Sequence, residues 1–341
     1  MPIRRLMRIV FLSPRFYPQI GGVEKHAFEV AKRLAEQHRV VVITEGVKDK
    51  KENFNGIKVI RLYFGKNDWF KKFIIWGKIL KHRKIIEKAD IVHCHDVFFW
   101  YLPLRIIYPN KKVFTTFHGY EAIFPPSSKA IFIRKLSEKL SNGNIAIGEY
   151  IRKWYGTTSE AIIYGAQDEA QARNTKFNKH KKLRILFVGR IEKDTGAEVY
   201  PQVLRKLKNY TFEACGDGTL RSELEKFGKV HGFVKDLTKY ISKADIIFAS
   251  SYLSIIAAIK LKKPVFSVFE NPLKEDYLKL TPFNRWIYIS KSPEILVKKI
   301  KIVVNKKRLR EKNLNLAYNW ANEQTWDKVS KIYLKLWGGR E

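Results

Sequence analysis

The most informative stretch of this sequence is Ile185-Leu-Phe-Val-Gly-Arg-Ile-Glu-Lys-Asp-Thr-Gly196. Its short apolar run ends abruptly in Gly189 and Arg190, and Lys193 follows at once. An apolar run bounded by glycine predicts a buried parallel strand, and ligands of open α/β sheets bind just beyond the carboxyl ends of such strands. Cations delivered to that position favour an anionic ligand, and a diphosphate fits the geometry.

A second strand, loop and helix of this kind lies near the beginning of the chain. The apolar run Met7–Ser13 is followed by a loop ending in Gly21-Gly22, and then by Val23–Leu34, where apolar residues recur at helical spacing. Glycine before a helix lets backbone N–H groups approach an anion closely. A lone Gly-Gly is also typical of an ordinary tight turn. Two such arrangements, one in each half of the chain, favour ligand binding.

Composition limits the possible classes of protein. The chain has 341 residues, 45% of them hydrophobic, so it can bury two ordinary cores. Its formal net charge of +33 indicates a polyanionic partner, either nucleic acid or an anionic membrane surface. No apolar run approaches the roughly 18 residues of a membrane span, and no secretory signal is evident. We therefore expect a cytoplasmic protein, peripheral on the inner face of the membrane.

The two cysteines, Cys94 and Cys215, lie in different halves of the chain and in strand-like surroundings. This placement indicates neither a disulfide framework nor a zinc site. We expect both to be small core residues.

The chain alternates strand and helix patterns throughout. Expected strands are Arg8–Leu12, Arg39–Thr44, Ile57–Leu62, Ile91–His93, Val113–Phe117, Asn144–Ile147, Arg184–Val188, Tyr210–Ala214, Ile246–Ala249, Pro264–Val268 and Trp286–Ile289. Repeated βα units predict an α/β protein with two doubly wound, Rossmann-like domains, which we expect to face each other across a cleft. The expected domains are residues 1–166, with the acceptor and membrane side, and 167–312, which bind the donor. The polar stretch Gln167–Lys182 would link them, and the helical segment 313–341 would cross back to the first domain.

Motifs in a fixed order extend this pattern over nearly the whole chain. They are Gly21-Gly22, His93-Cys-His95-Asp96, Phe117-His-Gly119, Ala146-Ile-Gly148, Val188-Gly-Arg190, Cys215-Gly-Asp-Gly218 with Arg221, Gly232-Phe-Val234, Ala244-Asp245 and Lys263-Pro-Val265. Together they resemble the retaining GT-B glycosyltransferases of family four, which use nucleotide sugars. The resemblance implies a nucleoside diphosphate sugar as co-substrate and no cofactor or metal. The absence of an Asp-x-Asp pair agrees with side-chain cations in place of a divalent ion.

The resemblance also implies roles for individual residues. His118 would line the reaction centre, and Arg190 with Lys193 would neutralise the departing diphosphate. Gly22 would pack near the donor diphosphate. The remaining residues implied in donor binding are Gly21, Gly216, Gly232, Phe233, Val234, Ser254, Ile255 and Ala257.

The sequence departs from the family pattern at two places. Where the family usually has Lys-Gly after the Gly-Arg pair, this chain has Thr195-Gly196, and Lys193 is the nearest cation. Ala257 stands where the family has the glutamate that holds the nucleotide ribose. Ser254 and Ile255 would still offer backbone N–H groups to the phosphates. A natural loss of activity, a weaker grip on the donor and a deliberate Glu-to-Ala change all fit this alanine.

Three histidines lie near predicted strand ends. His118 follows the strand Val113–Phe117, where a ligand should bind, although a purely structural histidine is the alternative. His93 and His95 should face the same side of their strand, but no third metal ligand is evident. Asp96 would orient His95 or meet the acceptor.

The segment Lys66–Lys88 carries two apolar stripes on one predicted helix. One stripe contains Trp69, Phe73, Trp76 and Leu80, and the other contains Ile75, Ile79 and Ile86. One stripe can cover the first domain's sheet, so the other fits shallow insertion into an anionic bilayer. The structural alternative is a helix that buries both stripes within the protein. A nucleic-acid surface is a third alternative, less favoured because no recognised nucleic-acid module is present. The expected membrane residues are Trp69, Phe70, Lys71, Lys72, Trp76, Lys78 and Lys81.

We therefore expect a glycosyltransferase that moves a sugar, with retention, from a nucleoside diphosphate to a lipid or lipid-linked glycan at the cytosolic membrane surface. The alternative is a catalytically impaired relative that binds membranes or polyanions. Donor turnover distinguishes the two.

Overall fold

The computed structural model describes residues 6–66, 69–119, 123–168 and 182–338. The chain divides into two compact units, one formed by Met1–Ile163 with Trp326–Glu341 and the other by Tyr164–Thr325. The division falls at Ile163 rather than at residue 166, and the segment that returns to the first unit begins at Trp326 rather than at 313. Most of the expected linker, 169–181, lies outside the described residues.

The first unit is built on an eight-stranded sheet in the order β3-β4-β2-β1-β5-β6-β7-β8. All neighbours are parallel except β3 and β4, which form an antiparallel edge. The strands are β1 (Arg8–Ser13), β2 (Arg39–Glu45), β3 (Lys50–Phe54), β4 (Ile57–Leu62), β5 (Ile91–His95), β6 (Val113–Phe117), β7 (Asn144–Ile147) and β8 (Ala161–Ile163). Because the strand order reverses at β1, the carboxyl ends of β1 and β5 form the topological switch point where ligands of such sheets bind.

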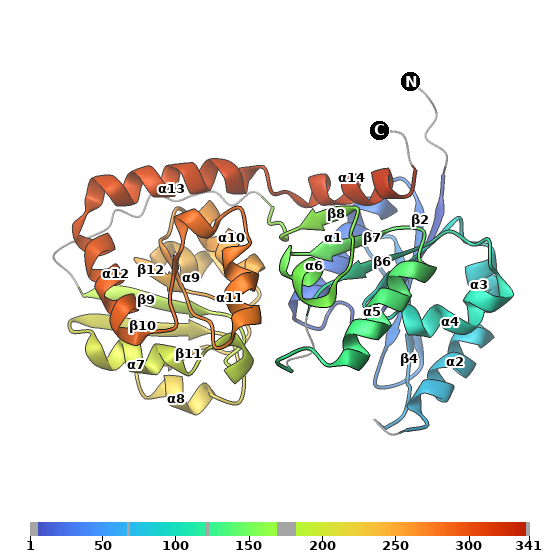
Figure 1. The fold of residues 1–341 in the computed structure, drawn as a ribbon, viewed down its shortest axis with the longest axis horizontal. Coiled ribbons are helices and arrows are strands. Elements are labelled where there is room, and N and C mark those ends of the chain that lie inside the picture. The colour runs from blue at the N-terminus through green and yellow to red at the C-terminus, as the bar shows by residue number, and fades with distance from the viewer. Residues whose placement is uncertain (1–5, 67–68, 120–122, 169–181, 339–341) are drawn as a thin grey trace. The chain divides into compact units, whose positions relative to one another are not determined.

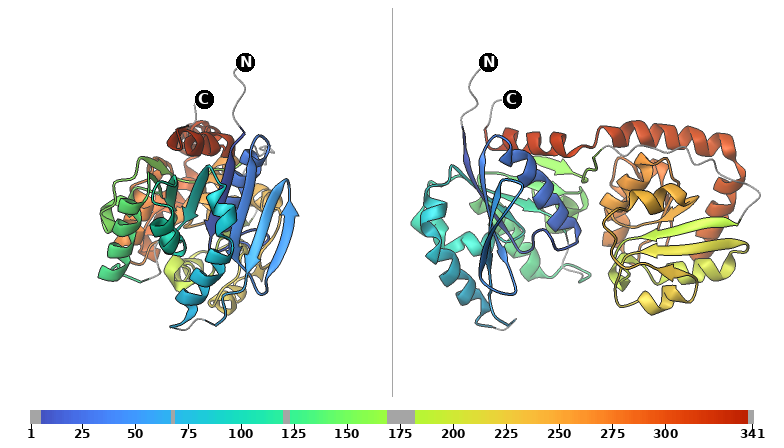
Figure 2. Two further views of the ribbon diagram at one scale, coloured as in Figure 1. Left: turned by 90° about the vertical axis from the view of Figure 1, so that its right-hand side faces the viewer. Right: turned by 180° about the vertical axis from the view of Figure 1, so that it is seen from behind.

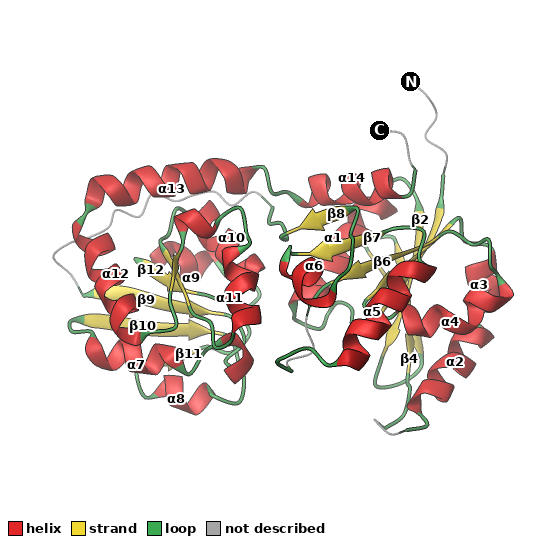
Figure 3. Cartoon of the chain, viewed as in Figure 1, coloured by secondary structure: helices red, strands yellow, loops and turns green. Residues whose placement is uncertain are grey.

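Helices cover both faces of this sheet (Figure 1 and Figure 3). They are α1 (Gly22–Ala35), α2 (Lys71–Lys81), α3 (Arg83–Glu87), α4 (Phe98–Ile107), α5 (Ser128–Leu140), α6 (Tyr150–Tyr155) and α14 (Trp326–Leu336). Alternate residues of a strand point to opposite faces. Val10 and Leu12 of β1 accordingly pack with α2 and α4, whereas Phe11 packs with Tyr333 of α14. The right-hand view of Figure 2 shows α1 and α2 on opposite faces.

The second unit has a parallel six-stranded sheet in the order β11-β10-β9-β12-β13-β14. Its strands are β9 (Leu183–Val188), β10 (Tyr210–Cys215), β11 (Lys229–Val230), β12 (Ile246–Phe248), β13 (Val265–Ser267) and β14 (Tyr288–Ile289). Its helices are η1 (Lys193–Thr195), α7 (Val199–Lys206), α8 (Arg221–Glu225), α9 (Thr238–Lys243), α10 (Tyr252–Lys260), α11 (Pro272–Lys279), η2 (Asn284–Trp286), α12 (Pro293–Asn305) and α13 (Lys307–Asn322). The switch point lies at β9, so the Gly189-Arg190 loop leaves the sheet where a ligand should bind.

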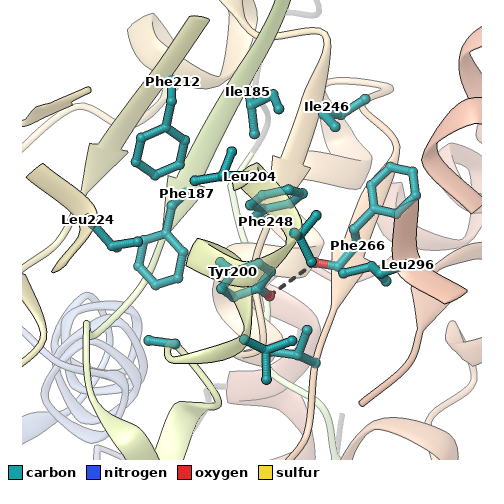
Figure 4. Close-up of a cluster of buried hydrophobic side chains, with 14 of the residues drawn as sticks. Ile185, Phe187, Tyr200, Leu204, Phe212, Leu224, Ile246, Phe248, Phe266 and Leu296 are labelled. Carbon is teal, nitrogen blue, oxygen red and sulfur yellow. Dashed lines mark hydrogen bonds between the residues drawn. The ribbon is translucent and has the colours of Figure 1, made fainter. Parts of the chain in front are cut away.

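The core of the second unit packs strands β9 and β12 against helix α7 (Figure 4). Phe187 of β9 and Phe248 of β12 are buried against Tyr200 of α7, whose ring stacks on Phe248 at a centroid distance of 4.6 Å. The Tyr200 hydroxyl donates to the backbone carbonyl of Phe266, 3.1 Å away. This satisfies the polar end of a fully buried side chain and ties α7 to β13.

The predicted fold class, α/β with two doubly wound parallel-sheet domains, is confirmed. Cys94 and Cys215 are free and buried, as expected of core residues. Every expected strand exists, with ends shifted by a residue or two. The sequence did not reveal β3, β8 or β11.

Candidate functional site

In the first unit, the carboxyl ends of β5 and β6 bring His118 beside His95. Thr116 pairs in register with His95, so the chain places His118 just beyond the strand ends. The Nε2 atom of His118 lies 2.8 Å from Nδ1 of His95. The backbone N–H of His118 donates to Asp96 Oδ1 over 3.0 Å. Asp96 thus holds the backbone of His118, rather than the ring of His95, in place.

Asp96 has a left-handed backbone, with φ of 59°, which few non-glycine residues adopt. Its carboxylate also lies 3.7 Å from Arg134, whose guanidinium donates to the carbonyl of Gly119. Arg134 is itself buried, with its guanidinium 4.2 Å from the Tyr155 ring centroid. These contacts hold the turn after β6 from both sides. Strain of this kind persists only where the surrounding structure enforces it.

His93 and His95 face the same side of β5, as predicted, but they belong to a larger buried group. The His26 ring of α1 lies 4.8 Å from the His118 ring and 6.3 Å from the His95 ring, measured between centroids. Burial lowers the pKa of His26 to about 3 and holds the pKa values of the other three histidines well below the ordinary value. All four imidazoles are therefore neutral at physiological pH. Among the described residues no group of three or more side chains is arranged to hold a metal ion.

The Gly21-Gly22 pair opens α1, as predicted. A Cβ on Gly21 would overlap the carboxylate of Glu24, which lies buried under the first turn. A Cβ on Gly22 would meet no atom of the described residues within 4 Å, and Gly22 is exposed. The fold therefore explains glycine at 21 but gives no internal reason for glycine at 22.

In the second unit, Arg190 follows β9 and its side chain is 55% exposed. Its guanidinium pairs with Asp194 at 2.6 Å, so the expected cation already has a carboxylate partner. Lys193 starts the short η1 helix and is exposed. Thr195 does not replace the family's lysine chemically, because its neutral hydroxyl lies within hydrogen-bond distance of two backbone carbonyls, those of Arg190 and Glu192, to which it can donate its one proton.

The structure adds a lysine that the sequence reasoning missed. Lys274 lies in the first turn of α11, near enough to Arg190, Asp194 and Glu270 for each to influence its pKa. Burial is the main influence and lowers the pKa of Lys274 to about 8. Burial also raises the pKa of Glu270, with Asp194 adding to the shift. The signal in the sequence was Asn271-Pro272, an N-cap pair that begins a helix just beyond β13.

The other predicted donor residues have different surroundings. Gly216 has φ of 155°, and a Cβ there would overlap the backbone of Gly189, so close packing of two loops requires this glycine. The backbone carbonyl of Gly232 accepts a hydrogen bond from the Gly216 N–H over 2.8 Å. Phe233 is 50% exposed and Val234 is partly exposed, which leaves both accessible to a ligand.

Helix α10 contains the remaining predicted donor-binding residues, which are Ser254, Ile255 and Ala257. The backbone N–H of Ile255 donates to the carbonyl of Ser251, 2.9 Å away, so it is not available to a phosphate. This corrects the expectation for Ile255 and leaves the amide of Ser254, whose hydroxyl accepts from Ser251. Ala257 is partly exposed, unlike the fully buried Ala258 beside it.

The two apolar stripes in and before α2 differ in how far they are buried. Ile75 and Ile79 are buried in the core, and Trp76 and Leu80 of the other stripe pack against the same core. The other two members of that stripe, Trp69 and Phe73, are 67% and 46% exposed. Phe70 is also 64% exposed, and the indole of Trp76 donates to the carbonyl of Phe99.

The lysines around this surface fall into two kinds. Lys71 pairs with Glu45 and Lys78 with Asp49, each at 2.7 Å. Lys72 instead lies over the rings of Trp69 and Phe73, 4.6 and 4.9 Å from their centroids, and Lys81 is exposed. In the part of the chain that is described, no helix has the length and hydropathy needed to span a bilayer.

Comparison with known proteins identifies the architecture. Residues 20–171 match the model of Glycosyltransferase Family 4. The phosphatidylinositol N-acetylglucosaminyltransferase GPI3 subunit of Saccharomyces cerevisiae is 23% identical over 262 residues, which cover 67% of this chain and 56% of the relative. The chain thus spans little more than half the length of that curated relative.

Two further proteins are similar over their full length. An α-1,4-N-acetyl-D-galactosaminyltransferase of Campylobacter jejuni, named for an undecaprenol-linked acceptor, is 22% identical, with 97% of this chain and 98% of the relative covered. The structure of HepE from Anabaena in complex with UDP and glucose superposes with a TM-score of 0.74 at 13% identity, covering 98% of this chain and 100% of that one.

Proposed function

Because this chain belongs to glycosyltransferase family 4, with a GT-B fold, we propose that it transfers a sugar from a nucleoside diphosphate donor to a lipid or lipid-linked glycan. We further propose that transfer occurs with retention, at the cytosolic face of a membrane. The observation that carries the proposal is the loop after β9. It presents a half-exposed Arg190 at the switch point of a Rossmann-like sheet, near the partly buried Lys274.

Arg190 has the role of stabilising charge on the departing diphosphate, with Lys193 or Lys274 as the second cation. Such electrostatic stabilisation is usually the largest catalytic contribution in sites of this kind. Side-chain cations make a divalent ion unnecessary, so we propose a metal-independent reaction without a cofactor. The pairing of Arg190 with Asp194 keeps the guanidinium in position until a diphosphate competes for it.

Retention is supported by the state of His118. Inversion by direct displacement would need a general base with a pKa near the working pH. Burial holds the pKa of His118 well below its ordinary value, which makes it a poor base. A neutral imidazole is suited instead to hydrogen bonding with the transferred sugar. Nuclear magnetic resonance of the product, which assigns the new anomeric configuration, tests this directly.

A lipid acceptor is supported by the surface of α2. Trp69, Phe70 and Phe73 are exposed side by side, with Lys72 over two of the rings. Exposed aromatic residues with lysines are typical of interfacial helices on anionic bilayers. The phosphatidylinositol and undecaprenol acceptors in the names of the relatives agree with this class of substrate.

Sugar transfer is tested by incubating the purified protein with single nucleoside diphosphate sugars and vesicles that contain lipid acceptors. We expect release of nucleoside diphosphate together with a glycolipid. Arg190→Ala should lower kcat/KM at least about a hundredfold, the usual effect of removing one such stabilising group. Arg205→Ala is a matched control, because it removes an equal charge from the last turn of α7. Equal activity of the two variants would contradict the role of Arg190.

One observation favours a second candidate. Ala257 lacks the carboxylate that the family uses for the ribose, so the chain could be an impaired transferase that binds membranes or polyanions. No turnover with any donor, together with retained binding to anionic vesicles, would support this alternative.

A further inference from the structure

A continuous chain of side-chain hydrogen bonds runs from Trp337, the residue after α14, through the sheet of the first unit and Tyr333 of α14 to His26 of α1. The Trp337 indole Nε1 lies 3.1 Å from His93 Nδ1, and His93 Nε2 lies 2.7 Å from Thr116 Oγ1. Thr116 Oγ1 lies 2.8 Å from the Tyr333 hydroxyl, which lies 2.9 Å from His26 Nε2. All five side chains are buried.

The direction of this chain follows from the indole at its beginning. An indole N–H can only donate, so Nδ1 of His93 must accept and carry no proton. The neutral His93 ring then carries its proton on Nε2, which donates to Thr116 Oγ1. A protonated His93 is excluded by the same contact, since two N–H groups would face each other.

The remaining steps are fixed by the number of partners. Thr116 is fully buried. Among the described residues, His93 and Tyr333 are the only side chains that form a hydrogen bond with its hydroxyl. Its hydroxyl accepts from His93 and must therefore donate to Tyr333, because an unmade buried hydrogen bond is expensive. The Tyr333 hydroxyl, having accepted that bond, donates to Nε2 of His26. The neutral His26 ring is left with its proton on Nδ1.

The contact between His95 and His118 places the proton of His118 on Nδ1, as in His26. One of the two nitrogens that meet at 2.8 Å must carry the proton. In the described part of the chain, Nε2 of His95 is buried without a partner, and an orphaned buried acceptor is tolerated better than an orphaned donor. His95 therefore donates from Nδ1 to Nε2 of His118. This leaves the His118 proton on Nδ1. That nitrogen is not among the buried polar atoms that lack a hydrogen-bond partner.

We propose that α14, together with Trp337 directly after it, fixes the tautomer of His26, so that His26 and His118 both present an Nδ1–H donor to an acceptor oxygen of the ligand. Trp337 and Tyr333 are positioning residues in this arrangement, acting on His26 through the sheet. His26 and His118 lie edge to face with centroids 4.8 Å apart, so both donors belong to one small region at the start of α1. The effect on sugar transfer rests on the proposed function, whereas the tautomers do not.

Nitrogen-15 magnetic resonance of the ring nitrogens tests the tautomers without any activity assay. The chain has eight histidines, and single histidine replacements assign their signals. At pH 7.5 we expect a protonated Nε2 in His93 and a protonated Nδ1 in His26 and His118. The opposite tautomer of either His93 or His26 in the unmodified protein overturns the proposal.

Variants of α14 test the cause. Trp337→Phe removes the first donor and Tyr333→Phe cuts the chain before His26, so either should convert His26 to a mixture of tautomers. Trp326→Phe is the matched control. Trp326 lies on the same helix as Tyr333, is fully buried and packs against His26 at a centroid distance of 5.3 Å, but among the described residues its indole N–H has no hydrogen-bond partner. If Trp326→Phe changes the His26 tautomer as much as Trp337→Phe does, the effect comes from packing and the proposal fails.

Kinetics separate this inference from the proposed function. If sugar transfer occurs, Trp337→Phe should lower kcat by roughly threefold to tenfold, the effect of one misdirected hydrogen bond, with little change in the donor KM. A chain with the expected tautomers but no transfer activity contradicts the proposed function and leaves the hydrogen-bond chain established.

Discussion

At the scale of single residues, burial of imidazoles without charged partners links the fold of the first unit to pH. An unfolded histidine takes up a proton below its ordinary pKa of 6.5, whereas folded His26 stays neutral down to about pH 3. Between these values the unfolded chain binds more protons than the folded one, so stability is complete above the unfolded pKa and is lost as the pH falls toward the folded pKa.

The first prediction is a loss of stability in mild acid. From pH 7.5 to pH 5, His26 alone should reduce the free energy of unfolding by about 2 kcal/mol, since below the unfolded pKa each pH unit corresponds to about 1.36 kcal/mol for one proton. Chemical denaturation at pH 7.5 and pH 5 measures the difference. His26→Gln, which cannot titrate, should show a smaller difference than the unmodified protein. An identical pH dependence in both would mean that His26 does not resist protonation.

The second prediction concerns the two glycines of α1. Gly22→Ala should leave the unfolding free energy unchanged or raise it by up to about 1 kcal/mol, because alanine is the better helix former and its Cβ would meet nothing. It should raise the donor KM about tenfold if a diphosphate packs there. Gly21→Ala is the contrasting variant, since it must displace the Glu24 carboxylate and so destabilise the fold. An unchanged donor KM for Gly22→Ala would remove Gly22 from the donor site.

At the scale of elements, the sequence predicts those strands whose apolar residues indicate burial on both faces of the sheet. The central strands β1 and β9 are near-continuous apolar runs, and both were predicted to within two residues at each end. Strand β3 reads Lys-Lys-Glu-Asn-Phe, and its identity depends on pairing with β4 at the sheet edge. Strands β8 and β11 are too short to show a period. Pairing with a neighbour, which no local pattern encodes, defines all three.

The third prediction compares two lysines in different elements. Lys274 of α11 is the more buried, and Lys193 of η1 is exposed to solvent, where its charge is screened. Lys274→Ala should therefore lower kcat/KM for the donor more than Lys193→Ala does, by roughly tenfold or more. Steady-state kinetics with the best donor measure both. The reverse order would restore Lys193 as the partner of Arg190.

The fourth prediction concerns α2 as a membrane element. Lys72→Glu should weaken binding to anionic vesicles, and so should Trp69→Ala, because both change the exposed aromatic surface. Lys78→Glu is the matched control, since Lys78 already pairs with Asp49. Binding should also fall steeply with salt, because charges are screened over about 8 Å at physiological ionic strength. Co-sedimentation with neutral and anionic vesicles measures this, and equal binding to both would exclude an electrostatic membrane surface.

At the scale of the whole molecule, the candidate site was only partly visible in the sequence. His118, Arg190 and the glycine loops follow strands, so their places could be predicted from local patterns. The links from Trp337 to His93 and from Tyr333 to His26 span 244 and 307 residues, and no local pattern predicts them. Lys274 was missed for a related reason, since its neighbours Arg190 and Asp194 come from a distant loop. The net charge of +33 predicted a polyanionic partner but not which surface would meet it.

The last prediction asks whether the whole protein lacks only one contact with its donor. A glutamate at position 257 could accept hydrogen bonds from both ribose hydroxyls, and a bond to a charged partner contributes about 1.5–3 kcal/mol at most. Ala257→Glu should therefore tighten nucleoside diphosphate binding in calorimetry by about tenfold or more and raise the rate of transfer. The melting temperature of the unliganded variant should differ little from that of the unmodified protein, because Ala257 is partly exposed and glutamate is a good helix former. Ala258→Glu is the matched control, since Ala258 is fully buried and a carboxylate there should unfold the second unit. If Ala257→Glu folds but binds nucleotide no better than the unmodified protein, position 257 does not face the ribose.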